Sequence, residues 1–182
     1  MEKYNVIEHE RKDVYIYGVE LILSTIAGLL ALIIVSACNG QFFQWFPYLL
    51  GFIPLRLFGG GYHAKSHMHC IITFTSTYLI CITFINFHTG IKFLVVGLSI
   101  IIFFVILHFS PVEAKNKKLS KSLHARNRQK SIVLGIVDMA ILVIYIDIPV
   151  NYVPWITEYL FGYISAGFFI LLATLKKYEE KI

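Results

Sequence analysis

The sequence predicts an all-α, polytopic integral membrane protein of about six transmembrane helices with both termini in the cytoplasm. Of its 182 residues, 57% are hydrophobic and only 15% are charged, whereas about a quarter of a soluble domain is charged. The mean hydropathy is +0.70. The apolar residues come in blocks, and a transmembrane helix needs roughly 20 of them to cross about 30 Å of hydrocarbon. The blocks lie at about 18–38, 42–58, 70–87, 91–110, 132–149 and 155–175.

The second and third blocks are short and polar at their inner ends, so the number of full spans is five or six. The first residues are too charged to form the apolar core of a signal peptide. Residues 1–17 are expected to form either an interfacial helix that leads into the first span or a solvated tail. Because no internal repeat or low-complexity segment divides the chain, residues 1–182 are expected to form a single membrane domain.

The distribution of basic residues predicts the orientation of the helices. With six spans, every Lys and Arg except Lys92 falls on one side, which the positive-inside rule makes cytoplasmic. Residues 111–131 form the basic cytoplasmic loop of this arrangement. The net charge of +5 therefore reflects topology and attraction to anionic lipid in the bilayer, and nucleic acid is not an expected partner. No cofactor is expected.

The stretch GGGYHAKSHMHC, residues 59–70, combines polar chemistry with a flexible turn between two apolar blocks. Ser66 is a plausible N-cap for the next helix, so Cys70 would lie in or just after its first turn. A helix N-terminus and a nearby imidazole both favour the reactive thiolate. Gly59, Gly60 and Gly61 permit a sharp reversal, and their N–H groups are oxyanion candidates. These are the parts of a cysteine peptidase.

Two histidines compete for the role of general base. His67 precedes Cys70 by three residues, so one helix would place both on the same face. His63 precedes Cys70 by seven residues, and a continuous helix would hold the two about 10 Å apart. His63 reaches the sulfur only if the chain bends between them, so local periodicity slightly favours His67.

Two motifs resemble the accessory gene regulator protein B (AgrB) family. The first comprises Arg56, Gly60, Tyr62, His63 and Ala64, with Cys70 seven residues after the histidine. The second, SPVEAKNK at residues 110–117, is similar to the family's A-P-x-x-x-x-N-K-P stretch. Here Ser110 precedes the first proline, and Lys118 stands where a second proline is common. The resemblance extends over essentially the whole chain.

This resemblance implies a membrane cysteine endopeptidase of Gram-positive bacteria, located in the cell membrane with its active site at the cytoplasmic face. Such a protein cleaves the C-terminal part of a small precursor and promotes cyclisation to a thiolactone or lactone autoinducing peptide for quorum sensing. The family's catalytic pair corresponds to His63 and Cys70. His67 does not match the motif, so the resemblance implies that the chain between residues 59 and 70 folds back.

Several further residues are candidates for substrate binding. The family's precursors are amphipathic and tend to have an acidic C-terminal tail, which the basic loop could dock; topology and lipid contact explain the same charges. Asp138 lies seven residues into the fifth block, where a carboxylate costs roughly 2.5–3.5 kcal/mol on insertion scales. A structural polar contact is an equal explanation for Asp138. The substrate-binding candidates are Arg56, Lys115, Lys117, Lys118 and Asp138.

Two other classes of protein are alternatives. The cluster of His63, His67, His69 and Cys70 offers zinc ligands, but no acidic base follows a histidine as in H-E-x-x-H, and no metal is expected. A small transporter or non-catalytic membrane partner is the other alternative, although no inverted repeat is visible. A homodimer stays open, because no G-x-x-x-G pair at a span interface requires one.

Overall fold

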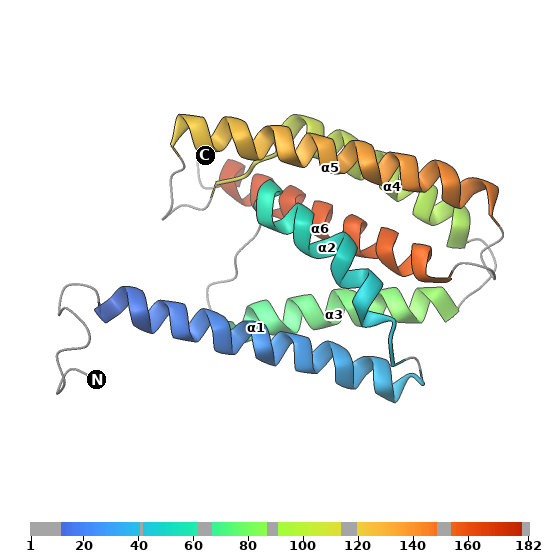
Figure 1. Ribbon diagram of the computed structural model, residues 1–182, viewed down its shortest axis with the longest axis horizontal. Helices are drawn as coiled ribbons and strands as arrows, with labels where there is room; N and C mark the ends of the chain where they lie inside the picture. The colour runs from blue at the N-terminus through green and yellow to red at the C-terminus, as the bar shows by residue number, and fades with distance from the viewer. Residues whose placement is uncertain are drawn as a thin grey trace.

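The computed structural model describes residues 12–40, 42–61, 67–86, 91–113, 120–148 and 154–179. Over these residues the chain is all-helical, with no named strand, which confirms the predicted all-α class. Six helices follow one another along the chain (Figure 1). They are α1 (Lys12–Cys38), α2 (Trp45–Gly59), α3 (His67–Asn86), α4 (Ile91–Phe109), α5 (Lys121–Asp147) and α6 (Pro154–Glu179).

The helices pack as three pairs that form layers (Figure 1). Helices α1 and α3 lie side by side in one outer layer, α2 and α6 form the middle layer, and α4 and α5 form the other outer layer. The middle pair makes the most extensive contact, and α4 also packs against α6. The middle layer is therefore the core of the molecule, and α6 is its most buried helix.

Two glycines explain how closely α2 and α6 approach each other. A Cβ on Gly51 would collide with the backbone carbonyl of Tyr159, and a Cβ on Gly162 would collide with the backbone carbonyl of Tyr48. The two close contacts are reciprocal, one glycine from each helix. Small residues at such crossings let helix backbones touch, which is a common means of holding helices together in membranes.

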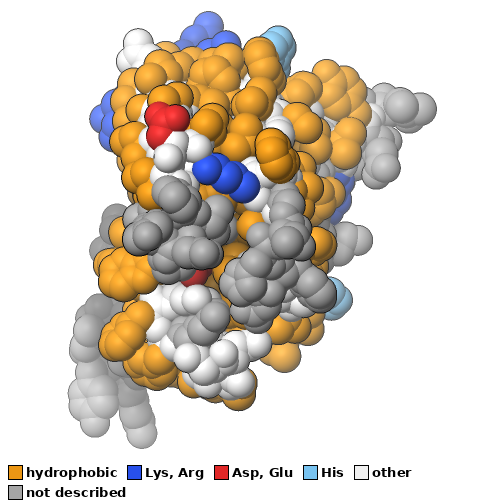
Figure 2. Space-filling view, turned by 90° about the vertical axis from the view of Figure 1, so that its right-hand side faces the viewer, with side chains coloured by type: hydrophobic (Ala, Val, Ile, Leu, Met, Phe, Trp, Pro, Cys, Tyr) orange, Lys and Arg blue, Asp and Glu red, His pale blue; other side chains and the backbone are white. Residues whose placement is uncertain are grey.

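The exposed surface has the character of a protein that faces lipid. Among the described residues, four helices are long and apolar enough to cross a membrane. Their candidate spans are Met68–Ile85, Ile91–Phe109, Lys121–Asp147 and Trp155–Tyr178. Many large apolar side chains are exposed, such as Phe93 at 86%, whereas soluble monomers rarely expose large contiguous apolar patches. Figure 2 looks onto the end where α4 and α6 begin; among the described residues in that view, hydrophobic side chains cover far more of the surface than charged ones do. The protein is a membrane protein; six spans and cytoplasmic termini stay predictions.

The boundaries of α5 correct the sequence analysis. Residues 121–131, assigned above to a basic loop, are the first three turns of α5. Ser120 has extended backbone angles, and its hydroxyl accepts a hydrogen bond from the Leu123 amide at 3.3 Å, which is an N-cap. The hydropathy pattern missed these turns because it detects apolar residues, whereas a cap and polar helix-formers begin a helix outside the apolar block.

The first helix begins before the first apolar block. Residues 12–17, which were expected to form an interfacial helix leading into the first span or a solvated tail, are helical and continuous with α1. Residues 1–11 lie outside the described part of the chain, so the expectation for them stays a prediction.

Lys92, the one basic residue expected on the opposite side from the other Lys and Arg residues, has a structural role at the end of α5. Its ammonium donates hydrogen bonds to the carbonyl oxygens of Ile146 at 2.6 Å and Ile148 at 3.1 Å. It also lies 5.7 Å from the centroid of the Tyr145 ring. The last carbonyls of a helix have no partner within the helix and carry partial negative charge, so Lys92 is satisfied there.

Candidate active site

Cys70 is the fourth residue of α3, and its side chain is exposed. It therefore lies in the first helical turn, as the sequence predicted. The first amides of a helix have no partner within it, and their partial positive charge favours an anion. The predicted cap Ser66 and the proposed base His63 both lie in residues 62–66, outside the described residues.

Two of the three glycines expected to form the turn, Gly60 and Gly61, do so, whereas Gly59 is the last residue of α2. Helix α2 ends at Gly59, and Gly60 and Gly61 have φ angles of 74° and 129°. Helix α3 begins at His67 and runs back along the bundle (Figure 1). The chain therefore reverses direction between the two helices. This reversal removes the objection that a continuous helix would hold position 63 about 10 Å from Cys70.

Arg56 ties the end of α2 to this reversal. Its Nη1 donates a hydrogen bond to the Gly60 carbonyl oxygen at 3.0 Å, and its guanidinium carbon lies 5.4 Å from the Phe169 ring centroid. The same nitrogen occupies the space that a Cβ on Gly61 would need. Arg56 also lies within electrostatic range of Cys70, so one cation contacts the turn and lies near the candidate nucleophile.

The two sequence motifs meet in space. The Val112 amide donates a hydrogen bond to the Gly59 carbonyl oxygen at 2.9 Å, and Val112 forms a parallel bridge with Gly60. A Cβ on Gly60 would collide with the Val112 carbonyl oxygen. Ser110 is 2% exposed, and its Oγ would lie 3.4 Å from a Cβ on Gly59. Residues 110–112 therefore pack against the glycine turn and bond to it. The sequence analysis did not predict this contact.

Basic side chains of α5 surround the same end of the bundle. Lys130 Nζ lies 4.4 Å from the Phe58 ring centroid at the end of α2. Arg128 Nη2 donates to the Leu107 carbonyl oxygen at 3.4 Å, and His124 lies 4.0 Å from the Glu113 carboxylate. The contacts of Lys130 and Arg128 place positive charge at the end of α2 and at the end of α4. The candidates Lys115, Lys117 and Lys118 lie outside the described residues.

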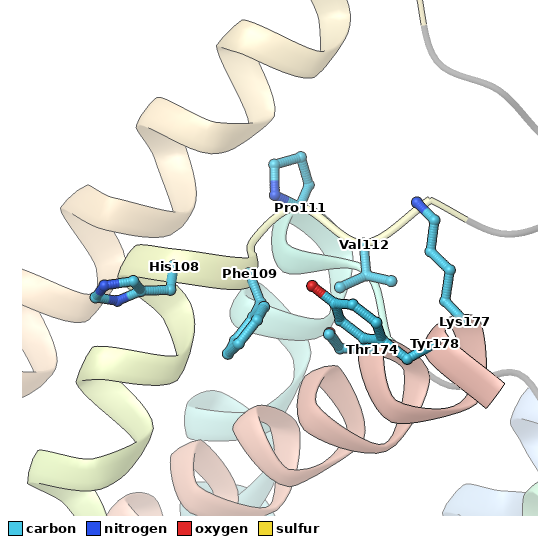
Figure 3. Close-up of a pocket in the computed structure, with 7 residues that line it drawn as sticks. All are labelled: His108, Phe109, Pro111, Val112, Thr174, Lys177 and Tyr178. Atoms are coloured by element: carbon cyan, nitrogen blue, oxygen red, sulfur yellow. The ribbon is translucent and has the colours of Figure 1, made fainter. Parts of the chain in front are cut away.

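A pocket of about 210 Å³ opens between the end of α4, residues 111–112 and the end of α6. Figure 3 shows the Tyr178 ring reaching from α6 toward the 109–112 segment, with Lys177 at one side and His108 pointing away on the other. Phe109, Pro111 and Val112 supply an apolar wall. Sequence reasoning treated His108 as a residue at a span end and did not single out Lys177.

Asp138 lies inside the bundle. It is 3% exposed, and its Oδ1 accepts a hydrogen bond from the Tyr159 hydroxyl at 2.6 Å. This contact joins α5 to α6 and favours the structural explanation of Asp138. Glu158, on α6, is a second buried carboxyl at 0% exposure, and sequence reasoning missed it. The insertion cost that identified Asp138 applies equally to Glu158.

The described residues contain no group of three or more His, Cys, Asp and Glu side chains placed to hold a metal ion. The side chains of His63 and His67 are not among those described. The zinc alternative therefore stays untested by the geometry.

The fold and the site define a helical membrane protein with a cysteine at a helix start and a glycine turn beside it. A family profile described as Accessory gene regulator B matches residues 1–175, and the chain belongs to this family. An AgrB-like protein of Clostridium perfringens strain SM101 is 26% identical over 151 residues, covering 79% of this chain and 67% of that protein. AgrB-like protein 2 of strain 13 is 27% identical over the same shares. No solved structure matches this chain significantly.

Family membership supports a role in accessory gene regulator quorum-sensing processing, with a pheromone precursor peptide as partner in the membrane.

Proposed function

We propose that this protein is a membrane cysteine endopeptidase that cleaves the C-terminal part of a small precursor peptide and promotes its cyclisation to a thiolactone or lactone autoinducing peptide. The observation that supports this most strongly is the arrangement at one end of the bundle. Cys70 lies in the first turn of α3, and Arg56 is within electrostatic range of it. The glycine turn that precedes position 63 in the sequence is held by the hydrogen bond from the Val112 amide to the Gly59 carbonyl oxygen.

In the proposed reaction, His63 accepts the proton of the Cys70 thiol, and the thiolate attacks the carbonyl carbon at the cleavage site. The amide bond then breaks, and His63 returns the proton to the departing amine of the C-terminal fragment. The rest of the precursor stays bound to Cys70 as a thioester. A cysteine or serine within the precursor attacks this thioester, closes the ring and releases the Cys70 sulfur.

Arg56 is a positioning residue in this proposal. Its hydrogen bond to Gly60 and its contact with Gly61 fix the direction in which the chain leaves α2 toward position 63. Its positive charge also lies within electrostatic range of Cys70. Both effects act before any substrate binds, which is the kind of preorganisation that makes a catalytic pair effective.

The basic side chains near the turn support docking of an acidic precursor tail. Lys130 and Arg128 are held beside α2 and α4 by their contacts with Phe58 and with the Leu107 carbonyl. Lys177 lies at the rim of the pocket next to residues 111–112. An apolar wall with a cation at its edge suits a peptide that is amphipathic and anionic, and exclusion of water there would favour ring closure over hydrolysis.

The test is co-expression with a candidate precursor, a short amphipathic peptide with an internal Cys or Ser and an acidic C-terminal tail, followed by detection of cleaved precursor. Cys70→Ala and His63→Ala should each abolish cleavage while the amount of membrane-inserted protein stays the same. Cys38→Ala and His69→Ala are the matched controls and should retain cleavage. Undiminished cleavage by Cys70→Ala would overturn the proposal. Loss of cleavage in His69→Ala as well as His63→Ala would favour the zinc alternative instead.

A further inference from the structure

Glu158 is a buried carboxyl that the proposed reaction does not use. It lies five residues into α6 and is 0% exposed. Neither of its side-chain oxygens has a hydrogen-bond partner among the described residues. Asp138 provides a contrast, because it is also buried but accepts a hydrogen bond from Tyr159. Glu158 is therefore the carboxyl whose burial needs an explanation.

Glu158 faces the seam between the α1–α3 pair and the middle layer. Tyr78 and Cys81 of α3 both lie within electrostatic range of it. The Tyr78 hydroxyl hydrogen-bonds with the Ser36 hydroxyl of α1. The Tyr78 ring centroid lies 4.9 Å from that of Tyr48 on α2. Side chains of α1, α2 and α3 therefore meet at Tyr78, which lies within electrostatic range of this carboxyl.

No cation neutralises Glu158 within the part of the chain that the structure describes. Lys92 of α4 is engaged with the carbonyl oxygens at the end of α5. The other buried titratable groups on the packed helices, together with the half-buried Tyr159, are phenols and a thiol, or the already bonded Asp138. These groups are Tyr48 of α2, Tyr78 and Cys81 of α3, Asp138 and Tyr145 of α5, and Tyr159 and Tyr163 of α6. The charged side chain of α2, Arg56, lies eleven residues farther along α6, on the Phe169 ring.

An ionised carboxyl in this setting would be strongly unfavourable, because burial removes its hydration and only the backbone amide of Glu158 itself offers a weak replacement. The partial positive charge at the start of α6 offsets only a small part of that loss. We propose that Glu158 is a proton-binding site in the α3–α6 seam, and that release of its proton separates the α1–α3 pair from α6. This inference does not depend on the proposed peptidase function.

The packing explains why ionisation of Glu158 would separate the α1–α3 pair from α6 and leave the α2–α6 contact intact. Helices α2 and α6 touch through backbone at Gly51 and Gly162. The α1–α3 pair meets the middle layer through side chains, as in the ring pair of Phe52 and Phe74 with centroids 4.8 Å apart. Side chains can withdraw from one another with less disruption than interlocked backbones, so a charge at Glu158 would act at this boundary.

Cys81 is a native reporter of the seam, since it is 1% exposed and lies beside Glu158. The experiment uses the full chain in membrane vesicles with Cys38→Ser and Cys70→Ser, which leaves Cys81 as the single thiol. N-ethylmaleimide labelling is timed from pH 6 to pH 9 for this protein, for Glu158→Gln and for Asp138→Asn. Thiol ionisation alone raises each rate by at most about tenfold per pH unit.

The Cys81 labelling rate is compared between the protein that keeps Glu158 and the Glu158→Gln variant at each pH. The ratio of the first rate to the second should rise at least about tenfold from pH 6 to pH 9. Asp138→Asn should show the same pH dependence of Cys81 labelling as the protein that keeps both carboxyls. A constant ratio at every pH would overturn the proposal.

Infrared difference spectra between the two proteins at pH 7 provide a second test that does not depend on labelling. A protonated carboxylic C=O band that is lost in Glu158→Gln and kept in Asp138→Asn supports the proton site. A carboxylate band in its place would contradict it.

Discussion

The guanidinium of Arg56 donates a hydrogen bond to the Gly60 carbonyl oxygen at 3.0 Å, across four residues at the end of α2. This bond fixes the first step of the chain after the helix, and the next residues lead to position 63. The same side chain is within electrostatic range of Cys70 on α3. Arg56 therefore links the segment that carries the proposed base to the helix that carries the nucleophile.

Replacing Arg56 with lysine should lower precursor cleavage by about tenfold or more. Lysine keeps the charge, but its single ammonium cannot both donate to Gly60 and lie flat against the Phe169 ring. A hydrogen bond from a charged group contributes about 1.5–3 kcal/mol, and about 1.4 kcal/mol corresponds to a factor of ten in rate. Cleavage per inserted protein is the measurement, and Arg126→Lys, an exposed arginine of α5, is the control. Equal cleavage by both variants would refute the role of Arg56.

Gly60→Ala should destabilise the protein more than Gly40→Ala. Both glycines have positive φ, at 74° and 71°, so alanine is strained at either site by about 1–2 kcal/mol. At Gly60 the new Cβ would also collide with the Val112 carbonyl, whereas nothing lies within 4 Å of a Cβ at Gly40. Thermal unfolding in detergent measures the difference. Equal losses would mean that residues 110–112 do not hold the turn.

Gly51→Ala and Gly162→Ala should each reduce stability by about 1–3 kcal/mol, because each forces α2 and α6 apart. The double variant should cost less than the sum, since the helices are already separated after the first substitution. Gly97→Ala on α4 is the control, because its Cβ would meet nothing within 4 Å. Unfolding in mixed detergent measures the free energies, and strict additivity would argue against a shared contact.

Asp138→Asn should change stability by less than about 1 kcal/mol and leave precursor cleavage intact. The asparagine carbonyl oxygen can still accept the hydrogen bond from the Tyr159 hydroxyl. Tyr159→Phe should cost more, about 1–3 kcal/mol, because it leaves the buried carboxyl unsatisfied. Unfolding and cleavage are measured on the same preparations. A large loss of cleavage in Asp138→Asn at normal stability would restore Asp138 as a substrate-binding residue.

Metal chelation should leave cleavage unchanged, because a thiolate and an imidazole need no metal to perform acyl transfer. The assay compares purified, membrane-reconstituted protein before and after dialysis against EDTA, with the zinc content measured in parallel. Loss of activity that zinc alone restores, with stoichiometric zinc in the active protein, would establish the alternative.

The sequence predicted the apolar helices well because hydropathy reports directly on lipid contact. The block at 91–110 became α4 at Ile91–Phe109, and the block at 42–58 became α2 at Trp45–Gly59. The predicted start of α5, at residue 132, was wrong by eleven residues, because the helix begins at Lys121 with polar turns that depend on the Ser120 cap. Composition alone cannot distinguish polar helical turns from a polar loop.

The candidate site was predictable only in part. The exposed thiol of Cys70 at a helix start and the positive φ of Gly60 follow from local sequence. The contact of Val112 with Gly59 does not, because no local pattern pairs residues more than fifty positions apart. The choice of His63 over His67 came from the family resemblance, and local periodicity pointed the other way.

The central claim is that the His63 imidazole activates the Cys70 sulfur. The most direct measurement is the alkylation rate of Cys70 by iodoacetamide at pH 7, in full-length membrane protein with Cys38→Ser and Cys81→Ser. We predict that His63→Ala lowers this rate by about tenfold or more, while His67→Ala leaves it nearly unchanged. Equal rates with and without His63, or a loss only in His67→Ala, would contradict the account.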